Sequence, residues 1–126
     1  MQDITPVIPS NAQVIESYGP ARFRVSSVKY NGSIIVLPKQ VLAWDITEFD
    51  QLQEDSFSSL LDTQTDLVLL GCGSSMRLPA RPLREIWKSQ GLNIELMETG
   101  AACRSYNFLL SEGRQVAAAL IGLDKD

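Results

Sequence analysis

The first third of the chain alternates apolar and polar residues in short runs, which is typical of β-strands. Two of these runs, residues 22–30 and 33–37, flank the dipeptide Asn31-Gly32. This dipeptide readily adopts the positive φ angles of a two-residue turn, so the pattern predicts a β-hairpin that turns at Asn31-Gly32. Further strands are predicted on either side of the hairpin, at residues 13–18 and 41–46.

Beyond residue 46 the apolar positions change their spacing and predict helices that alternate with strands. Continuous or alternating apolar runs predict strands at residues 66–70, 93–97 and 115–121. Apolar residues three to four positions apart predict helices at residues 54–61, 79–90 and 100–112. Thr99 is the expected N-cap of the last helix, because its hydroxyl can accept a hydrogen bond from a free N–H group. Short connections between such elements are typical of right-handed crossovers in a parallel sheet.

The length and composition fit one globular domain. The chain has 126 residues, of which 44% are hydrophobic and 21% are charged. No linker-like stretch separates the predicted elements, so residues 1–126 form a single domain in this interpretation. Residues 1–12 are expected to be a loose arm, residues 13–46 a β-rich part and residues 47–126 an α/β part.

Histidine is absent from the sequence, and this narrows the chemistry open to the chain. A Ser-His-Asp triad, a Cys-His dyad and an HExxH zinc site are excluded within one chain. The 11 Lys and Arg residues are scattered and are outnumbered by 15 Asp and Glu residues, which argues against a nucleic-acid groove. The residues alone do not name a reaction, and the lack of histidine is compatible with a non-enzyme.

No segment is expected to enter a membrane. The longest apolar runs, residues 67–70 and 116–121, are far shorter than the roughly 18 to 20 residues of a spanning helix. Any association with a membrane would therefore run through a protein partner. The N-terminus lacks the basic start of a secretory signal, and the two cysteines have neither CxxC spacing nor histidine partners for zinc. Reduced thiols, no metal and a cytoplasmic location are the expectation.

Two glycine-containing turns form the candidate ligand site. In an open α/β sheet, ligands bind at the carboxyl ends of parallel strands, where these turns would lie side by side. Glycines, helix N-termini and arginines would make the cleft between residues 71–77 and 99–104 suitable for a small anion. The candidate residues are Gly71, Cys72, Gly73, Ser74, Arg77, Arg81, Thr99 and Arg104. Alternatively, the glycines only make tight turns, because neither a complete GxGxxG nor a GK[ST] motif is present.

Three residues near the second turn have both a chemical and a structural interpretation. Cys103 lies in the first turn of its predicted helix beside Arg104, and both features would lower the pKa of a nucleophilic thiol. Free cysteine more often packs as a small buried apolar group. Tyr106 and Asn107 either line the cleft or make core and capping contacts. If the turns are adjacent, a reversible disulfide between Cys72 and Cys103 is a further alternative.

The same region carries a family resemblance. The strings METGAACRSYNFLLSEGR at residues 97–114, VAAALI at residues 116–121 and LLGCGSSMRLP at residues 69–79 resemble a family of small single-domain proteins of unknown biochemical activity. The family is widespread in bacteria and archaea, and its mitochondrial relative is an assembly factor for respiratory complex I. Ser105 stands where many relatives carry Thr, a change that keeps the hydroxyl.

The resemblance implies a fold and a class of function. It implies a three-layer α/β domain with a central mixed sheet of about five strands and an additional N-terminal β motif. It supplies no catalytic residues and no cofactor. By analogy, the leading expectation is a non-catalytic interaction or assembly-factor-like protein whose partner is a protein, and the mitochondrial relative points to a membrane-associated respiratory complex. The alternative is a small-anion-binding protein or an enzyme that uses the cleft between residues 71–77 and 99–104.

Overall fold

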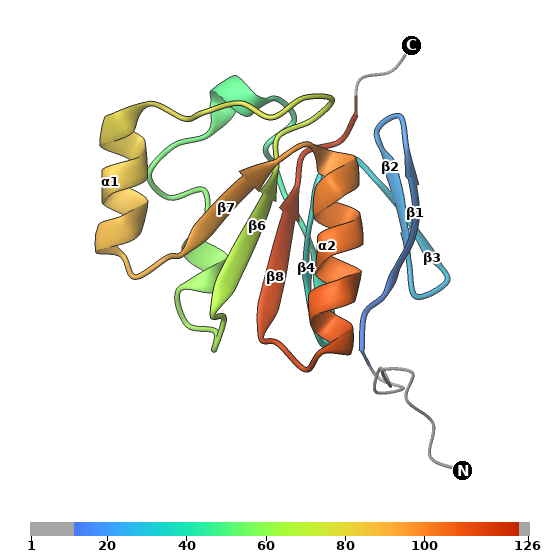
Figure 1. Cartoon of the computed structure of the whole chain (residues 1–126). Helices are drawn as coiled ribbons and strands as arrows, with labels where there is room; N and C mark the ends of the chain where they lie inside the picture. Colours follow the sequence, from blue (N-terminus) through green and yellow to red (C-terminus); the bar gives the residue numbers. More distant parts are fainter. Residues whose placement is uncertain (1–11, 124–126) are drawn as a thin grey trace.

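The computed structural model describes residues 12–123, so the predicted arm at residues 1–12 lies outside it except for Ala12. The described chain contains two β-sheets and two α-helices (Figure 1). A five-stranded mixed sheet lies in the centre, with helix α2 and a three-stranded sheet on one face and helix α1 on the other. The expected three-layer α/β domain with an additional N-terminal β motif is confirmed.

The small sheet is antiparallel and contains β1 (Ile15–Gly19), β2 (Arg22–Val25) and β3 (Val28–Asn31). A two-residue turn at Ser26-Ser27 joins β2 to β3, and its φ angles are both positive, 46° and 71°. The Glu16 carboxylate on β1 accepts a hydrogen bond from the Ser27 N–H group at 2.6 Å. This contact stabilises a turn that two serines adopt less readily than glycine.

The predicted hairpin at Asn31-Gly32 is wrong. The apolar run at residues 22–30 folds back on itself at Ser26-Ser27, and Asn31-Gly32 links the small sheet to the main sheet. Gly32 nevertheless has a φ of 84°, and the chain bends there. The local pattern places the hairpin incorrectly because the contact that stabilises the serine turn comes from β1.

The main sheet contains β4 (Ile34–Leu37), β5 (Gln40–Ala43), β6 (Leu67–Gly71), β7 (Ile94–Met97) and β8 (Val116–Leu120). Its strand order is β5-β4-β8-β6-β7. β4 pairs antiparallel with β5 and β8, whereas β6 pairs parallel with β7 and β8. The last strand in the sequence therefore joins the N-terminal and C-terminal parts of the sheet.

Helices α1 (Arg81–Ser89) and α2 (Thr99–Ser111) connect β6 to β7 and β7 to β8, respectively. Both were predicted to within two residues at each end. They lie on opposite faces because the first connection leads outward to the sheet edge and the second returns across β6. The predicted cap Thr99 is wrong, because the Glu98 carboxylate accepts the capping hydrogen bond from the Ala101 N–H group at 3.1 Å.

The predicted helix at residues 54–61 is also wrong. Residues 54–61 form turns and one short 3₁₀ segment at Ser58–Leu60, and a second 3₁₀ segment, Phe49–Gln51, precedes them. Phe57 packs between Trp44 and Trp87, with ring centroids 5.6 Å and 4.8 Å away. The two indole N–H groups donate to the main-chain carbonyls of Ser56 and Gln53. These long-range contacts favour turns over the regular helix that the apolar spacing suggested.

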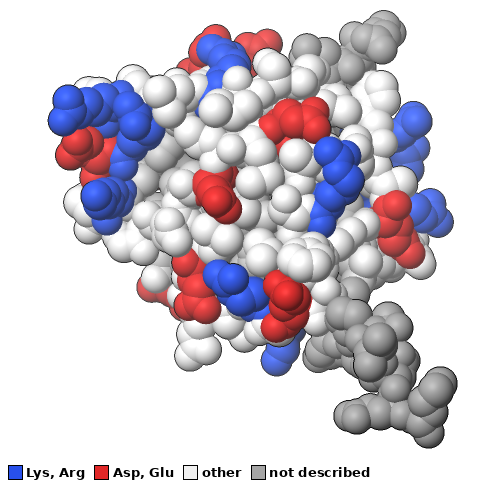
Figure 2. Space-filling view, in the orientation of Figure 1, with Lys and Arg blue, Asp and Glu red and all other residues white. Residues whose placement is uncertain are grey.

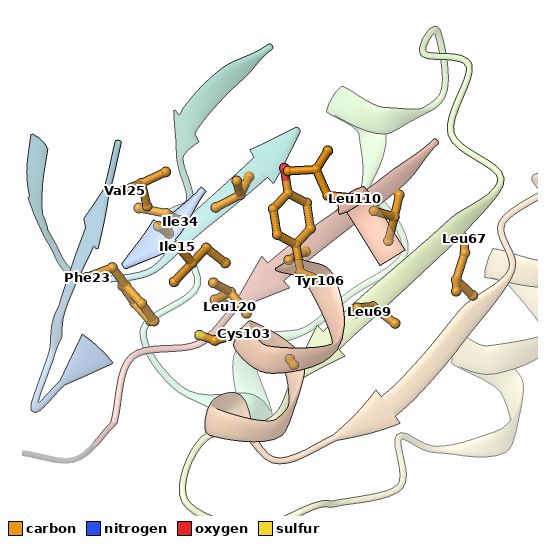
Figure 3. Close-up of a cluster of buried hydrophobic side chains, with 14 residues drawn as sticks. Ile15, Phe23, Val25, Ile34, Leu67, Leu69, Cys103, Tyr106, Leu110 and Leu120 are labelled. Atoms are coloured by element: carbon orange, nitrogen blue, oxygen red, sulfur yellow. The ribbon is translucent and has the colours of Figure 1, made fainter. Parts of the chain in front are cut away.

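Two apolar clusters fill the two sides of the main sheet. Figure 3 shows the cluster between the main sheet, α2 and the small sheet. Phe23 and Val25 of the small sheet and Tyr106 and Leu110 of α2 are all buried in it. The small sheet is therefore part of the core of the domain and not an appendage.

The polar contact between α2 and the small sheet comes from Asn107. Its side-chain oxygen accepts a hydrogen bond from the Ile15 N–H group at 2.9 Å, and its amide nitrogen donates to the Ile15 carbonyl at 2.7 Å. The side chain thus pairs with β1 in the way that a neighbouring strand would. Asn107 is therefore a structural residue that fixes the position of β1 against α2.

We predict that Asn107→Ala lowers the free energy of unfolding by roughly 1 to 3 kcal/mol, because two part-buried groups of Ile15 lose their partner. Urea unfolding followed by circular dichroism measures this change. Asn93→Ala is the matched control, because Asn93 is exposed and its side chain makes no hydrogen bond within residues 12–123. Equal stability losses in the two variants would contradict the role assigned to Asn107.

Candidate functional site

The two glycine-containing turns do lie side by side, as the sequence predicted. The Gly73 N–H group donates to the Thr99 hydroxyl at 2.9 Å, and the Thr99 N–H group donates to the Gly73 carbonyl at 2.9 Å. The Thr99 hydroxyl in turn donates to the Ile121 carbonyl at 2.7 Å. Thr99 is fully buried, so its side chain occupies the space between the turns and ties them to the end of β8.

Gly71 allows α2 to approach the end of β6 closely. A Cβ atom at this position would lie 3.0 Å from the Thr99 Cα atom and 3.2 Å from a Leu120 methyl group. Such contacts are tighter than packed side chains tolerate without movement. Gly71 is therefore explained by packing between the helix and the strand, which agrees with the structural interpretation of this glycine.

A cavity of about 310 Å³ lies beside the first turn, between the carboxyl ends of β6 and β8. The connections to α1 and α2 diverge to opposite faces between the adjacent ends of β6 and β7, the usual ligand site of open α/β sheets, and the cavity lies beside this point. The cavity is lined by residues 47–50, 72–75 and 121–122 and by Arg77. It thus includes Cys72, Gly73, Ser74 and Arg77, but no residue of the second turn. Sequence patterns did not point to residues 47–50, which come from the other half of the chain.

The charges around this cavity do not favour an anion. Arg77 lies 2.7 Å from the Asp50 carboxylate, and its guanidinium group lies 4.3 Å from the centre of the Phe49 ring. Glu48 adds a second carboxylate to the lining. The positive charge that was expected to attract an anion is thus already paired.

The other two candidate arginines lie away from this cavity. Arg81 pairs with Glu85 at 3.2 Å on the exposed side of α1. Arg104 donates a hydrogen bond to the Tyr18 hydroxyl at 2.8 Å and lies 3.4 Å from the Glu98 carboxylate. The structure therefore does not gather the three arginines around one ligand site.

The two cysteines are core residues on opposite faces of the main sheet. Cys103 packs in the cluster under α2 and Cys72 in the cluster on the α1 side, and both thiols are free. Burial raises the pKa of Cys103 to about 12 and outweighs the lowering effect of Arg104. Burial likewise raises the pKa of Cys72. The arrangement favours the inert interpretation of Cys103 over the nucleophilic one, and it separates the two thiols by the sheet.

Tyr106 and Asn107 complete the α2 motif, and both face the interior or the small sheet. Tyr106 is fully buried, and its hydroxyl has no hydrogen-bond partner among the described residues. Burial raises the pKa of this hydroxyl above its usual range. Cys103 and Tyr106 thus pack into the core, whereas Arg104 and Asn107 bond to β1. Arg104 and Asn107 thus attach the small sheet to α2, and none of the four residues lines the cavity beside the first turn.

We predict that Thr99→Val lowers the free energy of unfolding by roughly 2 kcal/mol or more, because the buried Gly73 N–H group and Ile121 carbonyl both lose their partner. Thr99→Ser is the matched control, since it keeps the hydroxyl and is expected to cost less. Denaturant titration of both variants tests this. A larger loss for the serine variant would show that the methyl group, not the hydroxyl, matters.

We also predict that stability falls as the pH rises above about 9. The Cys103 pKa is about 12 in the folded protein and 9.0 for an unperturbed thiol, so between these values the unfolded state binds fewer protons and is favoured. The contribution of the neutral Cys103 thiol to the free energy of unfolding is fully present below pH 9 and is lost as the pH rises toward 12. Urea titrations at several pH values should give a shallower decline for Cys103→Ala than for the wild type. Parallel declines would contradict the burial of this thiol.

Comparisons with known proteins reveal relatives along almost the whole chain. The chain is 37% identical over 115 residues to a Danio rerio protein named NADH dehydrogenase [ubiquinone] 1 alpha subcomplex assembly factor 3, covering 89% of this chain. The Drosophila melanogaster protein of that name is 34% identical over 113 residues, covering 86% of this chain. The chain spans only 66% and 58% of the lengths of these two relatives.

Bacterial proteins are similar over nearly their full length. An uncharacterised protein of Rhodobacter capsulatus is 35% identical over 112 residues, covering 89% of this chain and 86% of that protein. A Bartonella henselae structure described as an outer membrane protein has a TM-score of 0.79 at 33% identity, covering 94% of this chain and 100% of that chain. A Bordetella pertussis structure described as an Mth938-like domain shares the fold, with a TM-score of 0.78 at 20% identity over 98% of this chain and 95% of that chain.

A match to a protein-family model covers nearly all of the described fold. The model matches residues 15–121, which run from the first residue of β1 to the residue after β8. Both sheets and both helices therefore lie within the matched region. The chain belongs to the family described as "Protein of unknown function (DUF498/DUF598)".

Proposed function

We propose that this protein is a non-catalytic assembly factor that binds other proteins and assists the assembly of a membrane-associated respiratory complex. The observation that carries the proposal is the identity of 34% and 37% to two animal proteins named as assembly factors of NADH dehydrogenase. The similarity extends over 86% and 89% of this chain, and the family match at residues 15–121 includes both sheets and both helices. A role in binding partner proteins is the part of that function that this domain would supply.

The residues of the α2 motif make structural contacts, and this supports a binding role over a catalytic one. Arg104 and Asn107 are engaged with β1, and Cys103 and Tyr106 are buried in the core. Several large apolar side chains, by contrast, are exposed on the surface and are free to contact a partner. The most exposed are Met76 at 58%, Leu78 at 62% and Phe108 at 61%. Exposed apolar side chains of this size are common at protein–protein contacts.

The proposal places the protein in the cytoplasm, where it would reach a membrane through its partner. Neither helix in residues 12–123 has the length and apolar character needed to cross a bilayer. The thiols of Cys72 and Cys103 are free, which suits a reducing compartment. The net charge of −4 also favours a protein partner over nucleic acid.

A ligand-binding or enzymatic role at the turns around Gly73 and Thr99 has less support. Thr99 fills the space between the turns, and Arg77 beside the neighbouring cavity is paired with Asp50. A small anion at this cavity would therefore compete with the Asp50 carboxylate for the guanidinium group. The assembly role therefore remains the function that we propose.

The proposal predicts that a strain lacking this protein contains less fully assembled membrane NADH dehydrogenase and accumulates incomplete subcomplexes. Native gel electrophoresis of gently solubilised membranes, with in-gel NADH oxidation, measures both. Plasmid-borne wild-type protein is expected to restore assembly. Normal levels of the complete complex in the deletion strain would overturn the proposal.

A matched pair of variants separates surface effects from loss of folding. Phe108→Ser and Leu61→Ser each replace an exposed apolar side chain, 61% and 43% exposed, respectively. Both are expected to fold, because surface substitutions usually change stability by less than about 0.5 kcal/mol. If the face around Phe108 contacts the partner, only Phe108→Ser should fail to restore assembly.

A further inference from the structure

Strand β7 forms one edge of the main sheet and pairs on one side only, with β6. The carbonyls of Asn93 and Met97 accept hydrogen bonds from the β6 side. Because main-chain groups alternate in direction along a strand, the N–H and C=O groups of Ile94 and Leu96 point outward from the sheet. β7 is four residues long and has no lysine, proline or bulge, and its one charged residue is Glu95.

An apolar groove runs between this edge and helix α1. It has a volume of about 440 Å³, and its apolar floor is formed by Trp87, Leu92, Ile94 and Leu96. Trp87 is 2% exposed and its indole N–H group is bonded to the Gln53 carbonyl, so Leu92, Ile94 and Leu96 supply most of the accessible apolar surface. The groove is thus suited to apolar side chains of a segment that lies along β7.

The other face of the same edge is also hollowed. Glu95, Arg104, Ser105, Phe108 and Leu109 line a shallow depression of about 320 Å³. An added strand directs alternate side chains to opposite faces of a sheet. A strand paired with β7 would therefore place successive side chains in the groove beside α1 and in the depression beside α2.

Positive charge borders the groove. Arg84 and Lys88 of α1 line it, and neither lies within 4 Å of a carboxylate in the described part of the chain. Figure 2 shows Lys and Arg side chains gathered at the corner that α1 occupies. This corner stands out because the chain as a whole has a net charge of −4. The groove therefore favours an occupant with acidic side chains.

A second copy of this chain fits the edge less well. Two β7 strands paired antiparallel are related by a twofold axis perpendicular to the sheet, which brings both α1 helices to the same face. The positive side chains of Arg84 and Lys88 would then approach their equivalents. In the register that pairs Ile94 with Leu96, the two Glu95 residues would also face each other, and opposed like charges destabilise a strand pair.

We propose that the edge of β7 and the groove beside α1 bind an extended acidic segment of a partner protein, which adds to the main sheet as a sixth strand. The segment carries apolar residues at positions that face the groove, and Asp or Glu residues on the same face that reach Arg84 and Lys88. This inference rests on the proposed function, because it names the surface through which an assembly factor would hold a partner subunit. Main-chain pairing supplies affinity, and the alternate pockets supply specificity.

The test selects binders from a phage-displayed library of random peptides of about twelve residues, a length that exceeds the strand it would pair with. The bait is the purified full chain. Selected peptides are expected to combine acidic residues with alternating apolar ones. NMR hydrogen exchange of the complex should show new protection of the Ile94 and Leu96 N–H groups. No selected binder, or binders that leave these two groups unprotected, would overturn the proposal.

Charge-reversed variants test the positive border. The double variant Arg84→Glu, Lys88→Glu is expected to weaken binding of a selected peptide by roughly tenfold or more, and added salt should weaken binding to the wild type. Lys39→Glu, Arg114→Glu is the matched control, since both residues are exposed and lie outside the groove. Equal affinity of the two double variants would contradict the acidic character of the segment.

The same variants distinguish this inference from the proposed function. If the deletion strain lacks assembled complex and Arg84→Glu, Lys88→Glu restores it fully, the edge proposal fails while the assembly role stands. If deletion leaves assembly intact but selected acidic peptides still protect Ile94 and Leu96, the assembly role fails while the binding site stands.

Discussion

The architecture depends on strand β8, which is buried completely between β4 and β6. All five of its residues, Val116–Leu120, are fully inaccessible to solvent. The strand pairs antiparallel with β4 and parallel with β6, so it joins the two halves of the main sheet through main-chain hydrogen bonds. Three of its five residues are alanines, and their small side chains leave room for the bulky residues that pack on either face. A larger residue at these positions would separate the layers.

The most characteristic sequence motif of the chain serves this architecture. Cys103 and Tyr106 point from α2 into the core, whereas Arg104 and Asn107 bond to β1. Gly100 belongs to the same contact, because a Cβ atom there would lie 2.7 Å from the Tyr18 hydroxyl. A motif that looks chemical in the sequence therefore attaches the small sheet to α2. The surface that we propose for a partner lies along the edge strand β7, in the groove beside α1 and the depression beside α2.

Elements that depend on local contacts were predictable from the sequence, whereas those that depend on long-range contacts were not. The parallel strands and α1 and α2 were predictable because fully apolar runs and helical spacing are local patterns. The turn at Ser26-Ser27 depends on Glu16, and the turns near Phe57 depend on Trp44 and Trp87, so local spacing misidentified both. The adjacency of the two glycine turns was predictable from general rules of sheet topology. Thr99 fills the space between the two turns, and burial of the Cys103 thiol raises its pKa despite the nearby Arg104. Both features depend on tertiary packing, which the spacing of residues in the sequence does not reveal.

The central position of β8 has a consequence for how the chain folds during synthesis. β4 consists of four buried apolar residues, and its partner β8 is translated roughly 85 positions later, with Ile34 opposite Leu120. At typical translation rates of about 5 to 20 residues per second, the β4–β5 hairpin waits roughly 4 to 17 s for its central neighbour. During that interval an apolar strand edge is open to other chains, so the nascent protein itself needs shielding from aggregation until its last strand leaves the ribosome.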